Sequence, residues 1–219
     1  MSNPTAFAFF DFDDTLAKGD SILPFLLFCI RRGLAPKRQI FKAAAGFIGW
    51  KLTPASASVA KESTLSYIAG RTVDEMDEIA RAFFREVQQN RFFQEGIREL
   101  QQLRDKGVKP VIVSASADAY MRVLPEFLPV DAVLSTTCEV RDGRYTGHVG
   151  PNCKGEEKPR RIEAWLAQEG LVIDKERSSG YGDSPSDAPM LLLTASPVLV
   201  NPKRKLRRRI PTGRVVRWE

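Results

Sequence analysis

The chain has 219 residues, of which 43% are hydrophobic and 27% are charged. This composition is typical of a globular protein with a sizeable core, and it excludes disordered and collagen-like classes. The formal net charge is +6, but residues 203–219 hold eight basic residues and one acidic residue, so the remainder is close to neutral. Three scattered cysteines predict free thiols in a cytoplasm, with a bond between Cys138 and Cys153 as the alternative. No secretory signal is expected, because aspartates interrupt the first apolar run.

The first segment, residues 6–16, joins an apolar strand to a cluster of acidic residues. Five apolar residues precede Asp11 and predict a strand buried on both faces, as in a parallel sheet covered by helices. Asp11, Asp13 and Asp14 follow directly. Carboxylates at the end of such a strand need a cation or a proton, and open α/β sheets bind ligands there. A helix cap would explain a single aspartate, but this cluster favours a binding site.

Helical patterns dominate the next part of the chain. Ser21 is expected to cap a first helix, and Thr72 with Glu75 forms a capping box for the last. Helices are expected at residues 21–30, 36–52, 55–69 and 72–87. This helical block predicts an inserted cap of residues 18–92, with a core of residues 1–17 and 93–219. The first two helices are very apolar but too short to span a membrane. Packing within the cap is favoured, and a hairpin resting on a membrane surface is the alternative.

A second buried strand, residues 108–113, ends at Ser114, and a helix is expected to begin near residue 117. A hydroxyl followed by free helix amides forms a good phosphate cradle, although serine also commonly caps helices. A strand at residues 131–137 and a hairpin at 139–149 follow. His148, the single histidine, lies in the hairpin and is assigned no role.

The last charged positions also lie at element ends. Pro159 suits the first turn of a helix, so Lys158 lies where the helix dipole disfavours a cation unless an anion is near. A surface lysine is the alternative reading, and Lys154 is a competing candidate. A strand at residues 177–181 then runs into Gly-Asp-Ser-Pro-Ser-Asp, residues 182–187. Its second aspartate could simply complete a helix cap.

Taken together, these segments resemble the four motifs of the haloacid dehalogenase superfamily of phosphotransferases. Asp11-Phe12-Asp13-Asp14-Thr15-Leu16 is similar to the first motif, and residues 182–187 to the fourth. The resemblance implies an α/β fold, a Rossmann-like parallel sheet core with an inserted helical cap of the C1 type. It implies a phosphatase in which Asp11 is the nucleophile, forming an aspartyl phosphate, and Asp13 is the general acid and base. The implied phosphate ligands are Ser114, the backbone of Ala115, and Lys158, and the implied Mg²⁺ site comprises Asp11, Asp13, Asp183 and Asp187.

The position of the cap resembles that of subfamily IB, the phosphoserine phosphatase-like branch. Two departures concern the substrate. Phosphoserine phosphatases have glycines after the motif serine, where this chain has Ala115 and Ser116. They also have a glutamate nine positions after the nucleophile that holds the substrate amine, where this chain has the shorter Asp20. Asp20 is therefore a candidate specificity residue for a small amine-bearing phosphate, such as phosphoserine or histidinol phosphate.

Two alternatives remain. Residues 153–158 and 179–184 are also similar to phosphatidylglycerophosphate phosphatases of the C type, which implies a lipid phosphate hydrolysed at a membrane surface. The basic C-terminus could attract an anionic membrane, although the solvated face of a terminal helix is the favoured interpretation. The second alternative is a non-catalytic binding protein. The expected location is cytoplasmic, with attachment to the inner face of the membrane as an option. No nucleic-acid partner is expected, and the oligomeric state is left open.

Overall fold

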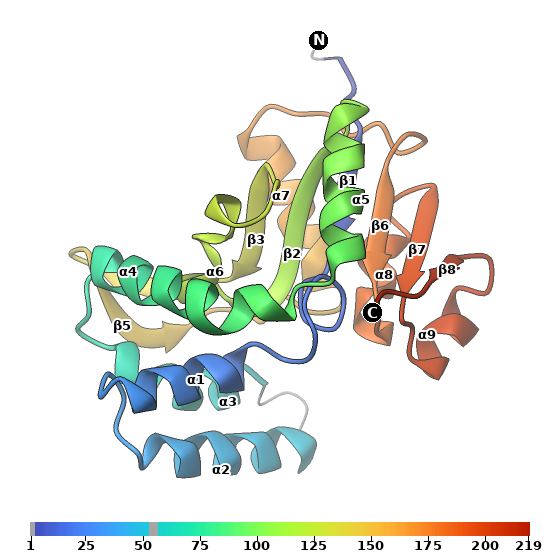
Figure 1. The fold of residues 1–219 in the computed structure, drawn as a ribbon. Helices are drawn as coiled ribbons and strands as arrows, with labels where there is room; N and C mark the ends of the chain where they lie inside the picture. Colours follow the sequence, from blue (N-terminus) through green and yellow to red (C-terminus); the bar gives the residue numbers. More distant parts are fainter. Residues whose placement is uncertain (1–2, 53–56) are drawn as a thin grey trace.

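The structure is a computed structural model that describes residues 3–52 and 57–219. Its centre is a six-stranded parallel sheet in the order β3-β2-β1-β6-β7-β8 (Figure 1). Every residue of β1 is buried, which explains why this strand consists of alanine and three phenylalanines. The strands are β1 Phe7–Phe10, β2 Lys109–Ala117, β3 Ala132–Thr136, β6 Ser179–Gly182, β7 Ser196–Val200 and β8 Arg214–Val216. The predicted α/β fold is confirmed.

Alternating side chains of β1 serve two hydrophobic layers, because successive strand residues point to opposite faces. Phe7 and Phe9 pack with α7 (Glu157–Gln168) and α8 (Ala188–Leu191). Ala8 and Phe10 face α5 (Gln94–Asp105), α6 (Asp118–Met121) and the cap. Phe10 also stacks on Tyr181 of the adjacent β6, with ring centroids 4.0 Å apart. Both faces of the sheet are thus covered, as the apolar strands require.

The strand order reverses beside β1. From β1 the chain moves outward through β2 and β3, and it then returns to β6 on the other side of β1. Open α/β sheets bind ligands at the carboxyl ends of the strands that flank such a reversal. Asp11 follows β1 and Asp183 follows β6, so the topology brings two motif aspartates to this point.

Among the residues that the structure describes, four α-helices of the cap lie between β1 and α5 in the sequence. They are α1 Ile22–Arg31, α2 Gln39–Leu52, α3 Ala57–Leu65 and α4 Val73–Phe83, the last continued by short turns through Arg91. The predicted capping box of Thr72 and Glu75 is present at the start of α4. The domain limits at residues 18 and 92 stay a prediction. The expected break at Thr53-Pro54 lies outside the described residues.

The hairpin of β4 (Cys138–Arg141) and β5 (Arg144–Val149) turns at Asp142 and Gly143, as predicted. It belongs to the sheet side of the chain but contacts the cap. The Gly70 amide donates to the Tyr145 carbonyl oxygen at 2.8 Å, and the Val73 amide donates to the Gly143 carbonyl oxygen at 3.1 Å. The hairpin therefore ties the cap to the core.

The two apolar cap helices have different surroundings. Helix α1 buries Phe25, Leu26, Phe28 and Cys29, and the Phe25 ring stacks on Tyr120 of α6 at 4.5 Å. Packing within the cap, the favoured interpretation, is seen for α1 in the contacts of Phe25 and Phe28 with Phe83 of α4, and the contact with Tyr120 adds packing against the core. Helix α2 is different, because Ile40 and Phe41 are exposed. Among the described residues, no helix combines the length and apolar character needed to cross a membrane.

Three local predictions are corrected by the structure. The Ser21 side chain does not cap α1; its hydroxyl contacts Ser116 and Tyr120, and Asp20 Oδ1 instead accepts a hydrogen bond from the Ile22 amide at 2.9 Å. The three cysteines are free and buried, so the alternative disulfide is wrong. The basic tail forms the expected helix, α9 (Arg204–Arg209), but its last residues also add the unpredicted strand β8 to the sheet.

Candidate active site

Asp11 is placed by the strand that precedes it. Its amide donates to the Tyr181 carbonyl oxygen at 2.9 Å, which extends the pairing of β1 with β6 by one residue. The next side chain, Phe12, points away into the aromatic contacts with Phe84 and Phe92. The chain then turns sharply, because Asp14 adopts a left-handed conformation with φ of 61°. Asp11 is thereby held at the end of the central strand, nearly excluded from solvent.

Lys158 approaches Asp11 from the first turn of α7. Its Nζ lies 2.7 Å from Asp11 Oδ1 and 2.8 Å from Asp187 Oδ1, and the side chain is 1% exposed. Burial alone would lower the pKa of Lys158, but the two carboxylates outweigh this and raise it, so the ammonium stays charged. A lysine at the start of a helix is unfavourable unless an anion lies nearby. In this structure the two aspartates, Asp11 and Asp187, are those anions. Lys154, the competing candidate, has an exposed side chain.

Asp187 has the capping role that the sequence left open, it also binds Lys158, and its role as a metal ligand stays a prediction. It completes the cap of Ser184, whose amide and hydroxyl donate to Asp187 Oδ2 at 2.9 and 2.8 Å. Its other oxygen binds Lys158. Gly182 is required for this approach, because a Cβ at that position would lie 2.6 Å from the Asp187 Cβ. Burial would raise the pKa of Asp187, but Lys158 and the Ser184 donors lower it, so the carboxylate is ionised.

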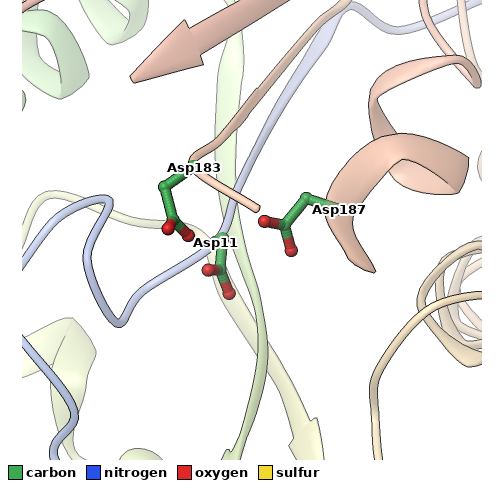
Figure 2. A group of neighbouring side chains, drawn as sticks. All are labelled: Asp11, Asp183 and Asp187. Atoms are coloured by element: carbon green, nitrogen blue, oxygen red, sulfur yellow. The ribbon is translucent and has the colours of Figure 1, made fainter. Parts of the chain in front are cut away.

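Figure 2 shows the carboxylates of Asp11, Asp183 and Asp187 directed toward one another. One oxygen from each lies within 4.8 Å of the others, and all three residues are buried. Burial and the charge of Asp187 raise the pKa of Asp11 well above its usual range, even with Lys158 in contact. Burial likewise raises the pKa of Asp183 to about 6. The three clustered carboxylates outnumber the two ammonium groups that contact them, Lys158 at Asp11 and Asp187 and Lys203 at Asp183, so this oxygen cluster fits a hard divalent cation.

Asp13 stands apart from this cluster and belongs to a hydroxyl network. Its Oδ2 accepts a hydrogen bond from the Ser116 hydroxyl at 2.6 Å. Ser116 in turn contacts Ser21, which contacts Tyr120. Burial, with a contribution from the charge of Asp20, raises the pKa of Asp13 to about 7. A carboxyl that titrates near neutrality suits a group that both donates and accepts a proton.

The predicted phosphate-binding residues Ser114 and Ala115 lie in the last part of β2, which continues to Ala117 and does not end at Ser114 as predicted; its pairing with β3 shifts register between Ser114 and Ala117. Ser114 is buried, and its Oγ accepts a hydrogen bond from the Ser116 amide at 3.0 Å. The Ala115 carbonyl oxygen accepts from the Thr136 hydroxyl at 2.6 Å, which joins the ends of β2 and β3. This part of β2 is thus fixed by a hydrogen bond from the neighbouring strand β3. Whether Ser114 and Ala115 bind phosphate stays a prediction.

Two lysines near the site were missed by the sequence analysis. Lys61 of α3 reaches out of the cap and donates to the Ala115 carbonyl oxygen and to Asn152 Oδ1, the latter at 2.6 Å. Burial lowers its pKa to about 8. Lys203 Nζ lies 2.6 Å from Asp183 Oδ2 and 3.3 Å from Asp14 Oδ2. No local pattern marks Lys61. Lys203 is the first residue of the basic run, and the sequence does not distinguish it from the solvated basic residues that follow.

Asp20, the predicted specificity residue, is exposed at the start of the cap. One carboxylate oxygen caps α1, as described above, and its charge contributes to the raised pKa values of Asp13 and Tyr120. Asp20 therefore lies close enough to the Asp13 side of the site to influence it electrostatically. Its role toward a substrate stays a prediction.

Comparison with known proteins agrees with this geometry. The family model described as haloacid dehalogenase-like hydrolase matches residues 8–192. The phosphoserine phosphatase SerB1 of Mycobacterium tuberculosis is 29% identical over 214 residues, covering 93% of this chain and 67% of that protein. The inhibition of morphological differentiation protein of Streptomyces azureus is 30% identical over 213 residues, covering 94% and 76%.

Solved structures show the same fold. A crystal structure of a protein with unknown function from Bordetella pertussis has 26% identity and a TM-score of 0.84, covering 98% of this chain and 99% of that one. A phosphoserine phosphatase with a phospho-aspartyl intermediate analogue has 18% identity and a TM-score of 0.62, covering 97% and 93%, and supports the fold alone. The chain therefore belongs to the haloacid dehalogenase-like hydrolase family, as a phosphatase that is similar in sequence to a phosphoserine phosphatase.

Proposed function

We propose that the protein is a Mg²⁺-dependent phosphomonoester hydrolase that works through an aspartyl phosphate on Asp11. The observation that carries this proposal is the buried contact of Lys158 with both Asp11 and Asp187 at the strand reversal. The lysine orients Asp11 and supplies positive charge where the oxygens of a phosphoryl group would be placed. Such charge stabilises phosphoryl transfer, which depends mainly on positioning and electrostatics.

In the first step, an Asp11 carboxylate oxygen attacks phosphorus and the bond from phosphorus to the ester oxygen breaks. Asp13, protonated, gives its proton to the leaving alkoxide. In the second step, Asp13 as carboxylate takes a proton from water, whose oxygen attacks phosphorus and releases Asp11 and inorganic phosphate. Ser116 keeps the Asp13 carboxyl oriented through both steps, because its hydroxyl donates to Oδ2 at 2.6 Å. One group with a pKa of about 7 can serve in both directions.

Asp11, Asp183 and Asp187 would hold the Mg²⁺ ion, and a role of Asp13 beside them is part of the same proposal. When bound, the ion neutralises negative charge on the transferring phosphoryl group and on Asp11. Lys203 already occupies one oxygen of Asp183 from the solvent side. The clustered hard oxygens favour Mg²⁺ over softer metals.

The proposed substrate is a small phosphomonoester that carries an amine, such as phosphoserine or histidinol phosphate. Two features support it. The relative from Mycobacterium tuberculosis is named a phosphoserine phosphatase. Asp20 places an exposed carboxylate near the Asp13 side of the site, where an ammonium group could be bound. The three free thiols support a cytoplasmic location as part of this proposal.

The test is phosphate release with Mg²⁺ from a panel of amine-bearing, sugar, lipid and aryl phosphomonoesters. We expect turnover of at least one member, and we expect Asp11→Asn to abolish it, with a loss of at least about a thousandfold. Asp142→Asn is the matched control, because Asp142 is exposed in the hairpin turn and asparagine tolerates its positive φ of 50°.

Each outcome is informative. If the wild type releases no phosphate even from the aryl ester, the hydrolase proposal fails and a binding role replaces it. Preference for the lipid member would replace the small metabolite with the lipid alternative. If Asp11→Asn keeps full activity, the covalent mechanism is wrong.

A further inference from the structure

The side chains of α2 that the structure describes, up to residue 46, anchor the helix to the rest of the cap through one side. Gln39 is buried and its side-chain amide donates to the Ser63 and Thr64 carbonyl oxygens and to the Ser66 hydroxyl. Gly46, on the same side, lies so close to α3 that a Cβ would be 3.1 Å from the Ala60 Cα. These contacts determine which face of α2 is turned outward. Figure 1 shows α2 as the outermost helix of the cap, on the side away from the sheet.

The outward face of α2 is apolar. Phe41 is 77% exposed and Ile40 is 40% exposed, and the alanines at positions 44 and 45 are exposed as well. Single exposed apolar residues are common on protein surfaces, but adjacent ones on a single helix face form a patch. Helix α1 differs, because its phenylalanines are buried. In α2, by contrast, the apolar side chains of Ile40 and Phe41 are not covered by packing within the protein.

Basic side chains border this patch. Lys37, Arg38 and Lys42 are exposed, and none of them forms an ion pair with a described acidic residue. From residue 21 to residue 61 the sequence contains seven basic residues and no acidic residue. The helix therefore presents an apolar strip with an unbalanced positive border. Helices with this combination lie in the interface of anionic lipid bilayers, with aromatic and aliphatic side chains in the acyl boundary.

We infer that the outward face of α2, comprising Ile40, Phe41 and Lys42, together with Lys37 and Arg38 in the turn just before the helix, is a docking surface for an anionic lipid bilayer. A second copy of the chain fits this face less well, because a symmetric contact would bring two positively charged borders together without acidic partners. The inference is independent of the proposed hydrolysis, since binding requires no turnover. It also differs from attraction by the basic C-terminus, because α9 lacks an exposed apolar strip: its apolar residue, Leu206, is buried.

The test is sedimentation of the full chain with vesicles of phosphatidylcholine alone and of phosphatidylcholine and phosphatidylglycerol in equal amounts. We expect binding to the mixed vesicles only, weakened by added salt. Phe41→Ser should lower the partition coefficient about tenfold, because it removes one aromatic anchor. Lys37→Glu combined with Lys42→Glu should lower it by at least about tenfold.

Matched controls separate this face from the rest of the surface. Leu192→Ser removes an apolar side chain from the surface of the α/β core domain, where Leu192 is 60% exposed, and it should leave vesicle binding unchanged. Arg207→Glu with Arg208→Glu tests the basic tail and should retain most of the binding. Thermal unfolding of Phe41→Ser should match the wild type, because the side chain is exposed.

Three results would overturn the inference. The wild type could fail to sediment with the mixed vesicles. Binding could be lost in the tail variant and kept in the α2 variants, which would assign the membrane surface to α9. Gel filtration could show a wild-type dimer that Phe41→Ser converts to a monomer, which would assign the face to a second copy of the chain.

Discussion

The carboxyl edge of the sheet and the cap hold their functional groups by different physical means. At the sheet edge, Asp11 and Asp183 directly follow neighbouring strands, and Lys158 begins a helix, so backbone geometry places their side chains. The charges there are buried and paired. From the cap, Lys61 and Ser21 reach the core only through side-chain contacts. The comparison teaches that side chains at the ends of elements are positioned by the backbone, whereas Lys61 and Ser21 join the cap to the core through contacts that a single substitution can remove.

The largest effect is expected where the buried charges meet. Lys158→Met leaves Asp11 and Asp187 without their shared ammonium, so the free energy of unfolding should fall by about 3–5 kcal/mol. Urea unfolding without Mg²⁺ measures this. Lys203→Met is the control: its lysine also contacts aspartates but is 57% exposed, so the loss should stay within about 1 kcal/mol. Equal losses of unfolding free energy in the two variants would contradict the expectation that the buried lysine contributes more than the exposed one.

The cap contact should give the next effect. Lys61→Met removes the donor to Ala115 and Asn152, a contribution of about 1.5–3 kcal/mol for hydrogen bonds from a charged group. Amides of α3 should then exchange with solvent at least about tenfold faster, and kcat/KM should fall. Lys61→Arg should restore part of both. Lys42→Met, an exposed lysine of the same cap, should change neither in the absence of lipid. Unchanged exchange in Lys61→Met would show that the contact does not hold the cap.

Ser116→Ala should change the pH dependence of hydrolysis rather than abolish it. The Ser116 hydroxyl stabilises the ionised form of Asp13, so its loss raises the pKa of Asp13 above about 7. Transfer of a proton to the leaving group requires protonated Asp13, and activity therefore declines as pH rises through this pKa. The alkaline limb of kcat/KM should shift upward by about one pH unit.

The exposed Ser196 provides the control, since Ser196→Ala should leave the profile unchanged. A shift of the alkaline limb toward lower pH in Ser116→Ala would contradict the assignment of Asp13 as the proton donor.

The smallest effect is expected at Asp20. Asp20→Asn removes an exposed carboxylate, so KM for an amine-bearing phosphate should rise by up to about fivefold, as for one exposed ion pair. An aryl phosphate without an amine serves as the internal control and should keep its KM. An equal rise in KM for both substrates would show that Asp20 does not determine substrate specificity and would assign it a structural role at the start of α1.

The sequence by itself determined the strands that carry the motif residues, the order of those residues and the fold class. Buried parallel strands are continuous apolar runs, and polar residues that follow such a run are visible as sharp breaks, so Asp11, Ser114 and Asp183 could be located without coordinates, although the strand of Ser114 continues to Ala117. The lysine at the start of α7 was predictable for a related reason, because a cation is unfavourable there without an anion. These signals are local in the chain.

Only the tertiary structure decided the features that depend on distant contacts. Apolar α1 and apolar α2 are alike in sequence, yet one buries its phenylalanines against α6 and the other exposes Phe41. Lys61 and Lys203 reach the site from far along the chain, and β8 is a strand because β7 offers a free edge. Hydrophobicity and charge determine whether a side chain favours burial or an ion pair. Which residue becomes its neighbour depends on how the helices and strands pack together.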